Sequence, residues 1–275
     1  MRTVRALWGA SHPGPALVVT ALSLALGLAA GLEAWRVAVL VASVLFGQLS
    51  IGISNDMIDR ERDRAVGRRD KPLVRGEVSS RTAWIAAAGS VVVALALSSV
   101  LGWGMLLAHA VTIASAWSYN LGLKATAVSV VPFLVSFGLF PSLATLSAPE
   151  PVLAAPFAAV AGAALGAAVH LTNVLPDLDD DRRTGVRGLP HRLGATISVF
   201  AAVAGIVIAA VAVIGGGGAG GPLPGVFFVA VLVLAGAVVV RMRLRGPDRT
   251  GFRLVMASAL LLAAQLVATA GALAA

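Results

Sequence analysis

The sequence contains no cysteine, which excludes disulfide bonds and thiolate chemistry and leaves the redox compartment undetermined. Charge is also scarce: Asp, Glu, Lys and Arg make up 12% of the 275 residues, about half of the share in soluble domains. Hydrophobic residues make up 58% and aromatic residues 5%. So few charges cannot cover a soluble surface, and the composition therefore predicts an integral membrane protein.

Long uncharged stretches indicate where the chain would cross a bilayer, since one transmembrane helix needs about 20 apolar residues. Residues 82–123 and 193–240 each have room for two helices, with breaks at Gly102-Trp103-Gly104 and at Gly215 to Gly221. The sequence predicts an all-α fold in which residues 1–275 form one domain, an integral membrane bundle of nine transmembrane helices around a central cavity. The nine expected helices are 15–32, 36–55, 82–101, 104–121, 126–146, 152–175, 194–214, 224–241 and 253–273.

Basic residues test this number of spans, because Lys and Arg concentrate on the cytoplasmic side of a membrane protein. Nine spans put 20 of the 21 Lys and Arg residues on the side of the N-terminus and leave Arg36 opposite. This segregation favours nine spans with a cytoplasmic N-terminus in a bacterial plasma membrane. The net charge of +8 would suggest nucleic acid in a soluble domain, but here it lies at the ends of membrane helices. We therefore expect the lipid bilayer as a partner and no nucleic acid.

Two acidic motifs stand at the ends of the second and sixth expected helices, and both read Asn-x3-Asp-x3-Asp. Their members are Asn55, Asp59 and Asp63, and Asn173, Asp177 and Asp181. On a continuous helix these positions fall within an arc of about 80° and a rise of about 12 Å. Each motif would then present an amide and two carboxylates on one stripe, although Pro176 interrupts the second helix.

Paired acidic motifs of this kind suit magnesium-dependent diphosphate chemistry. Mg²⁺ takes one or two carboxylates together with phosphate oxygens, and Lys or Arg side chains bind the remaining phosphate oxygens. Cations placed where charge develops lower the barrier to ionisation. One alternative is that the clusters are orientation signals and interfacial ion pairs, but their matched spacing on one side favours the metal site. Another alternative is a carrier of divalent ions. The absence of charged residues from the middle of the expected membrane helices argues against it.

At these residues the sequence resembles the UbiA superfamily of membrane prenyltransferases. The first motif and the following Lys71-Pro72-Leu73-x2-Gly76-x-Val78-Ser79 look like the first signature of that family. Asp177-x-Asp179-Asp180-Asp181 with Gly185-x-Arg187 looks like its second signature, and Tyr119-x4-Lys124 is similar to a third short motif. Nine transmembrane helices are also the architecture of the family, so the resemblance covers the whole chain.

The resemblance implies a membrane enzyme that moves a prenyl group from a prenyl diphosphate to an aromatic or lipid acceptor, with two Mg²⁺ ions and an active site facing the cytoplasm. The implied metal ligands are Asn55, Asp56, Asp59 and Asp63 on one side and Asp177 and Asp181 on the other. The implied diphosphate contacts are Lys71, Arg75, Lys124 and Arg187. The implied catalytic residues are Asp59, Asp63, Asp177, Asp181 and Tyr119, the last near the departing group. Two positions depart from the common pattern: many members have arginine at Lys71 and lysine at Arg187, which keeps the charge but changes the hydrogen-bond geometry.

A terpene cyclase on the same fold is a close rival, because the motifs do not separate the two reactions. The acceptor and the length of the donor chain also lie beyond the motifs. His170 shares a helix face with Asn173 and Asp177, so it would either point into the cavity or hydrogen-bond to another helix. Five aromatic residues are candidates for lining the prenyl channel or for ordinary packing: Phe46, Trp117, Phe133, Phe137 and Phe140.

Overall fold

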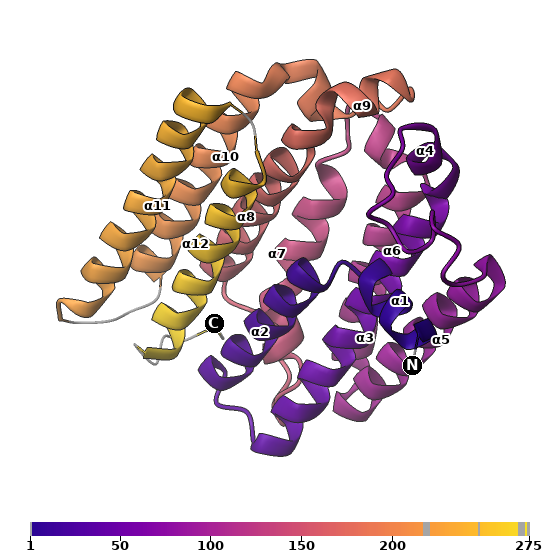
Figure 1. Ribbon diagram of the computed structural model, residues 1–275. Helices are drawn as coiled ribbons and strands as arrows, with labels where there is room; N and C mark the ends of the chain where they lie inside the picture. Colours follow the sequence, from indigo (N-terminus) through magenta and orange to yellow (C-terminus); the bar gives the residue numbers. More distant parts are fainter. Residues whose placement is uncertain (1, 217–220, 247, 269–272, 274–275) are drawn as a thin grey trace.

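The computed structural model describes residues 2–216, 221–246, 248–268 and 273, and within these residues the protein is a bundle of α-helices (Figure 1). The long helices are α2 (Pro13–Ala29), α3 (Ala34–Ile58), α5 (Ser80–Leu101), α6 (Trp103–Leu121), α7 (Val131–Thr145), α8 (Pro156–Val174), α10 (Leu189–Gly216), α11 (Leu223–Arg245) and α12 (Arg249–Ala268). The short elements are α1 (Arg2–Ala10), α4 (Arg60–Ala65), the 3-10 turns η1 (Leu123–Ala125) and η2 (Leu175–Asp177), and α9 (Leu178–Arg183).

The prediction of an all-α membrane bundle is confirmed, and each expected helix overlaps one long helix of the described chain. Six helices in this part of the chain are long and apolar enough to cross a membrane alone: α3, α5, α8 with its continuation to Arg183, α10, α11 and α12. A seventh span exists if α1 and α2, which meet at an angle of 73°, form one broken span. α6 and α7 do not belong to this group, and α7 has 15 residues. By length and composition the described helices therefore supply six or seven spans.

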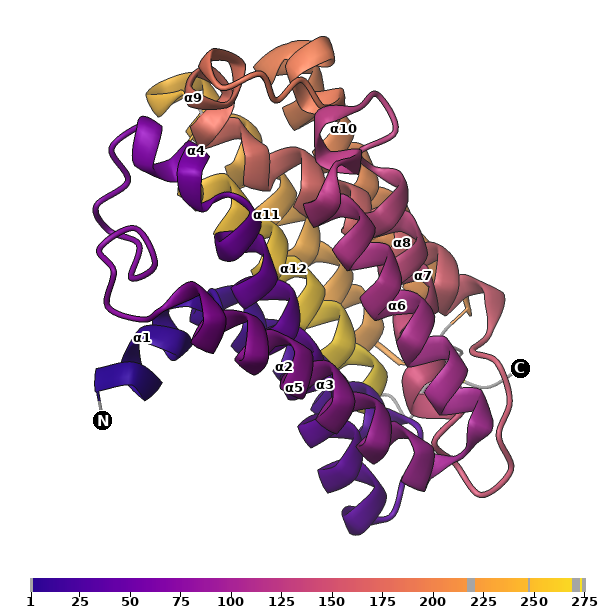
Figure 2. The same ribbon diagram turned by 90° about the vertical axis from the view of Figure 1, so that its right-hand side faces the viewer.

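The helices pack as a closed ring, which leaves room for a cavity in the middle. α2 packs on α3, α3 on α5 and α6, α6 on α7, and α7 on α8. The ring continues through α10 and α11 to α12, and α12 closes it by packing against both α8 and α2 (Figure 1). Figure 2 shows the short helices α4 and α9 at the same end of the bundle, so both acidic motifs lie at one end of the ring.

One of the two helix boundaries that the sequence indicated by glycine lies within the described residues, at Gly102. Gly102 separates α5 from α6 with a φ of 122°, as expected from the Gly102-Trp103-Gly104 break. α10 begins at Leu189, earlier than the expected residue 194, and Gly194 forms a kink inside it with a φ of 79°. Of the expected glycine break after α10, residues 217–220 lie outside the described residues, as do residues 269–272 at the end of the last expected helix.

Both acidic motifs contain a helix break, which the sequence indicated at Pro176 in the second motif but not in the first. α3 ends at Ile58, and Asp59 links it to α4. α8 ends at Val174, and η2, which contains Pro176, links it to α9. Proline has no backbone N–H and cannot complete the α-helical hydrogen bonds at this point. The two stripes are therefore each divided between the end of a long helix and a short helix that caps it.

Close packing of α8 against its neighbours depends on glycine at three positions. A Cβ at Gly162 would lie 2.1 Å from the carbonyl oxygen of Phe137, and one at Gly166 would lie 2.6 Å from that of Phe133. A Cβ at Gly205 in α10 would lie 2.6 Å from the carbonyl oxygen of Ala164. The Gly162-x3-Gly166 spacing puts both glycines on the face of α8 that meets α7. Small residues thus let the backbones of three helices approach directly.

We expect Gly162→Ala to destabilise the bundle by about 1–3 kcal/mol, because the added methyl group would overlap backbone that cannot move aside. The matched control is Gly236→Ala in α11, where no atom lies within 4 Å of the added Cβ; it should keep or slightly raise the stability. Thermal unfolding of both purified variants in detergent measures the difference. Equal melting temperatures for the two variants would contradict this packing.

Candidate active site

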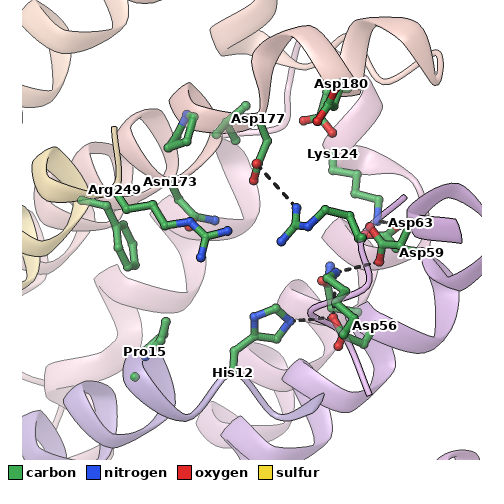
Figure 3. Close-up of a pocket in the computed structure, with 18 of the residues that line it drawn as sticks. His12, Pro15, Asp56, Asp59, Asp63, Lys124, Asn173, Asp177, Asp180 and Arg249 are labelled. Carbon is green, nitrogen blue, oxygen red and sulfur yellow. Dashed lines mark hydrogen bonds and ion pairs between the residues drawn. The ribbon is translucent and has the colours of Figure 1, made fainter. Parts of the chain in front are cut away.

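An acidic cavity of about 600 Å³ lies at the end of the bundle that carries α4 and α9 (Figure 3). Its walls come from α1, α2, α3, α4, α6, η1, α8, η2, α9, α10 and α12, together with the loops that follow α4 and α9. The motif residues in its lining are Asn55, Asp56, Asp59, Asp63, Asn173, Asp177, Asp180 and Asp181. The structure therefore brings the two motifs, more than a hundred residues apart in the sequence, to one cavity.

The first motif is buried, and its carboxylates are neutralised by lysine. Asp56 is 2% exposed and Asp63 is 3% exposed. The Lys71 ammonium lies between them, 2.9 Å from Asp56 Oδ1 and 2.7 Å from Asp63 Oδ2. Burial lowers the pKa of Lys71, but attraction to Asp56 and the contact with Asp63 outweigh it and raise that pKa above its ordinary value. Lys71 is therefore held as a cation between two carboxylates.

Asp59 has two cationic partners of its own. Lys124, in η1, donates a hydrogen bond to Asp59 Oδ1, and Arg62 Nη2 donates to Oδ2 at 2.8 Å. Burial lowers the pKa of Lys124 below its ordinary value; Asp59 opposes this shift, while Arg62 and Lys71 add repulsion. Lys124 thus contacts the first motif from the turn that follows α6, although it lies 65 residues from Asp59 in the sequence.

Two arginines connect the first motif to the second. Arg62 Nη1 lies 3.6 Å from Asp181 Oδ1. Arg68 Nη1 lies 3.6 Å from Asp177 Oδ1, a contact drawn as the dashed line at Asp177 in Figure 3. Arg62 Nη1 is buried and has no hydrogen-bond partner in the described part of the chain. The sequence analysis did not single out either arginine. Arg62 could have been found from its position three residues after Asp59, one helical turn away. Nothing in the sequence indicates that the loop after α4 brings Arg68 back to the cavity.

The amide of Asn55 is positioned by a third asparagine that the sequence analysis also missed. Asn55 Nδ2 donates to Asn120 Oδ1 at 3.1 Å. Asn120 Nδ2 in turn donates to the carbonyl oxygen of Ile51 and to Ser54 Oγ, both at 3.0 Å. The position of Asn120 directly after Tyr119 was the feature of the sequence that could have indicated this role. Through these bonds α6 fixes the side chain at the start of the first motif.

An apolar chamber of about 230 Å³ adjoins the acidic cavity. Residues that line both spaces are His12, Pro15, Asn55, Tyr119, Asn173, Phe252 and Met256. The Tyr119 ring stands edge-on to Phe133, with ring centroids 5.1 Å apart, and Phe133 stacks with Phe137. The polar end of the bundle therefore opens onto an aromatic and aliphatic interior.

Three of the five aromatic candidates, Phe133, Phe137 and Phe140, line this chamber. Phe46 and Trp117 are not in its lining; Trp117 Nε1 donates to Ser50 Oγ at 3.0 Å. His170 belongs to the lining of the acidic cavity, and its Nε2 is also hydrogen-bonded with Ser129 Oγ at 3.0 Å, in the turn before α7. His170 therefore faces the cavity, as one of the two expectations had it, while its hydrogen bond goes to a turn and not to another helix.

The structure does not bring Arg75 and Arg187 into the acidic cavity. Arg75 Nε lies 2.5 Å from Glu77 Oε1, and Arg75 Nη1 donates to the backbone oxygens of Arg69 and Asp70. Arg187 is exposed on the outer surface. Among the other expected diphosphate contacts, Lys71 and Lys124 line the cavity, and so does Tyr119.

The carboxylate and amide oxygens of the two motifs are the hard donors that Mg²⁺ prefers. Within the described residues, however, no three acidic or histidine side chains are already gathered as a metal site. The carboxylates contact Lys and Arg instead, and Arg62 Nη1, which makes no hydrogen bond within the described residues, lies 3.6 Å from Asp181 Oδ1. This donor set fits a cation that arrives together with an anion such as a diphosphate.

A ring of apolar helices with an acidic and basic cavity above an apolar chamber defines a membrane protein suited to phosphate-bearing amphiphiles. The model of the UbiA prenyltransferase family matches residues 16–261, and the chain belongs to this family. It is thus a membrane prenyltransferase, as the resemblance at its motifs implied.

Relatives support this assignment over most of the chain. A curated digeranylgeranylglyceryl phosphate synthase from Natronomonas pharaonis is 27% identical over 214 residues, which are 76% of each chain. The apo structure of a UbiA homologue from Aeropyrum pernix has a TM-score of 0.76 at 20% identity, covering 91% of this chain and 97% of that one. A UbiA homologue from Archaeoglobus fulgidus bound to GPP and Mg²⁺ has a TM-score of 0.71 at 17% identity, covering 95% and 99%. These solved structures share the fold.

Proposed function

We propose that residues 1–275 act as one domain that transfers a prenyl group, with Mg²⁺, from a prenyl diphosphate to an aromatic or lipid acceptor. The observation that carries the proposal is the contact between two unlike spaces: the acidic cavity, with its Lys and Arg side chains, opens onto the apolar chamber at Tyr119 and Asn55. A prenyl diphosphate has the same division into a polyanionic head and an apolar chain. The solved relative bound to GPP and Mg²⁺ supports this class of donor.

The side chains of the motifs would hold two Mg²⁺ ions, with Asn55, Asp59 and Asp63 at one and Asp177 and Asp181 at the other. Bound there, the metal neutralises charge on the diphosphate and on the leaving group as the ester bond ionises. Asp56 also belongs to the first motif, but Lys71 and His12 both contact its Oδ1. We therefore assign Asp56 to holding these two side chains as well as to the metal site.

The cations of the cavity would exchange their carboxylate partners for phosphate oxygens. Lys71, Lys124 and Arg62 already lie beside the motif carboxylates, and Arg62 Nη1 makes no hydrogen bond within the described residues. Arg68 would join them from the loop. The four proposed diphosphate contacts are therefore Lys71, Lys124, Arg62 and Arg68. A diphosphate contact of Arg75 or Arg187, which the sequence analysis also expected, stays a prediction.

The residues around the chamber would orient the prenyl chain and exclude water. Tyr119 lines both spaces and packs against Phe133 of the chamber, and the π faces of these rings would stabilise positive charge that develops on the prenyl carbon. The carbon–oxygen bond to the diphosphate breaks, the diphosphate leaves with the electron pair, and an acceptor atom bonds to the prenyl carbon. The proton of the acceptor is released to solvent. Aliphatic and aromatic walls keep water from competing with the acceptor.

We also propose nine spans with the N-terminus and the active site at the cytoplasmic face of a bacterial plasma membrane. α6 packs against α3 and α5, and α7 packs against α6 and α8. The helices α3, α5 and α8 are each long and apolar enough to cross a membrane. A ring cannot lie in a membrane with two of its members outside it. The distribution of Lys and Arg supports the same orientation.

The direct test is incubation of the purified protein with Mg²⁺ and labelled geranyl diphosphate, with and without a membrane lipid extract, followed by identification of the products. A labelled product that requires the extract supports transfer to an acceptor. A cyclic terpene formed without the extract would instead assign a cyclase. Absence of any turnover, with retained Mg²⁺ binding, would contradict the proposal.

We expect Asp59→Asn and Asp177→Asn each to lower turnover by roughly a hundredfold or more, because each removes a carboxylate from one side of the site. The matched control is Asp179→Asn, which changes a motif aspartate that is 85% exposed and does not line the cavity. Initial rates with labelled donor measure the effect, and size-exclusion profiles establish that the variants fold. Near wild-type turnover in a folded Asp59 or Asp177 variant would exclude that motif from the site.

Single cysteines test the topology directly, because the chain has no cysteine of its own. Ala65→Cys, in α4 beside the active site, should react with a membrane-impermeant maleimide only after the cells are opened. Ala34→Cys, at the start of α3 and exposed, should react in intact spheroplasts. The reverse pattern would overturn the orientation, and reaction of both cysteines from one side would overturn the number of spans between them.

A further inference from the structure

Two polar side chains line the apolar chamber well away from the acidic cavity. Of the α6 residues in the chamber lining, His109 is the farthest from Tyr119 in the sequence, about 15 Å along the helix. On α3, Gln48 lies two helical turns before Asn55, or about 11 Å along that helix. Because Tyr119 and Asn55 line both spaces, Gln48 and His109 lie deep in the chamber.

The hydrogen bonds of His109 determine which of its ring nitrogens is an acceptor. Ser98 Oγ donates its proton to the carbonyl oxygen of Ala94 at 2.7 Å, so it accepts from His109 Nδ1 at 2.8 Å. In the neutral ring, a proton on Nδ1 leaves Nε2 with a free lone pair. His109 is 3% exposed, and its Nε2 has no hydrogen-bond partner among the residues that the structure describes. The chamber wall therefore contains a buried acceptor with nothing to accept from.

The free nitrogen of His109 lies beside α3, next to Gln48. A Cβ at Gly47 would be 2.8 Å from His109 Nε2, so glycine at this position makes room for the imidazole. Gln48 follows directly, and its half-buried amide makes no hydrogen bond in the described part of the chain. Two hydroxyl groups of the same chamber are already used: Thr112 Oγ1 donates to the carbonyl oxygen of His109, and Ser136 Oγ donates to that of Thr112. Gln48 and His109 thus form a polar pair whose partners have to come from within the chamber.

The volume of the chamber indicates how much of a prenyl chain fits in front of this polar pair. An apolar cavity of about 150 Å³ holds one benzene ring. By the same measure the chamber, at about 230 Å³, has room for about nine carbon atoms. A geranyl chain is close to this size, whereas a farnesyl chain carries a third isoprene unit. That unit would have to lie against Gln48 and His109.

We propose that Gln48 and His109 select the length of the donor chain, so that the site takes geranyl-sized donors and disfavours farnesyl and longer ones. The inference rests on the proposed function and names the donor class that it left open. A short chain leaves water on the amide of Gln48 and on Nε2 of His109. A longer chain displaces this water with hydrocarbon, which cannot replace the hydrogen bonds and leaves buried polar atoms without partners.

The experiment measures binding of non-hydrolysable analogues of geranyl, farnesyl and geranylgeranyl diphosphate, with Mg²⁺, to the purified full-length protein. The wild-type protein should prefer the geranyl analogue by about tenfold or more. In the double variant Gln48→Met/His109→Leu, whose new side chains are apolar and of similar size, this preference should fall by about tenfold. The matched control is Thr112→Val, which removes a hydroxyl that already has its partner in α6 and should keep the preference. Measuring all proteins in one detergent cancels the partition of long chains into micelles.

Equal binding of the three analogues by the wild-type protein overturns the inference and leaves the proposed function standing. An unchanged preference in the double variant, or an equal loss of preference in Thr112→Val, also overturns it. Size-exclusion profiles report whether the double variant folds; if it does not, Gln48→Met and His109→Leu are measured singly, and each should lose part of the preference. Failure of the wild-type protein to bind any of the three analogues with Mg²⁺ contradicts the proposed function, and the inference with it.

Discussion

Lysine and arginine hold the buried carboxylates of the acidic cavity in place, and the rest of the site depends on this neutralisation. Lys71 lies between Asp56 and Asp63, and Lys124 and Arg62 share Asp59. A carboxylate taken out of water without such a partner costs several kcal/mol. The partners are also what a diphosphate needs. A metal ion that takes the carboxylates frees the cations, and a diphosphate that takes the cations frees the carboxylates, so the two are expected to bind together.

The position of the cavity follows from how the ring is built. Close approach at Gly162 and Gly166 joins α7 to α8, and α12 closes the ring against α2. Both motifs stand where a long helix ends and a short one begins, which points their polar groups into the end of the ring rather than along its walls. The interior below them stays apolar. The same architecture therefore places the acidic cavity directly next to the apolar chamber, and Tyr119 and Asn55 line both.

Much of this arrangement could be predicted from the sequence, because a membrane imposes simple rules on composition. Uncharged stretches located the long helices, and matched Asn-x3-Asp-x3-Asp spacing located both sides of the cavity. The sequence could not reveal contacts made by segments that fold back from loops. Arg68 reaches Asp177 from the loop after α4, while Arg75, seven residues further along, turns outward to Glu77. Similarly, Pro176 indicated a helix break in the second motif, but no residue in the sequence indicated the break at Asp59 in the first.

Isothermal titration of the protein with a non-hydrolysable geranyl diphosphate analogue, with and without Mg²⁺, tests the shared use of carboxylates and cations most directly. We expect Mg²⁺ to tighten binding of the analogue by about tenfold or more, and by linkage the analogue must tighten Mg²⁺ by the same factor. Neither ligand alone can satisfy both the carboxylates and the cations of the cavity. Equal affinity for Mg²⁺ in the presence and in the absence of the analogue would contradict this account and would favour a carrier of free divalent ions.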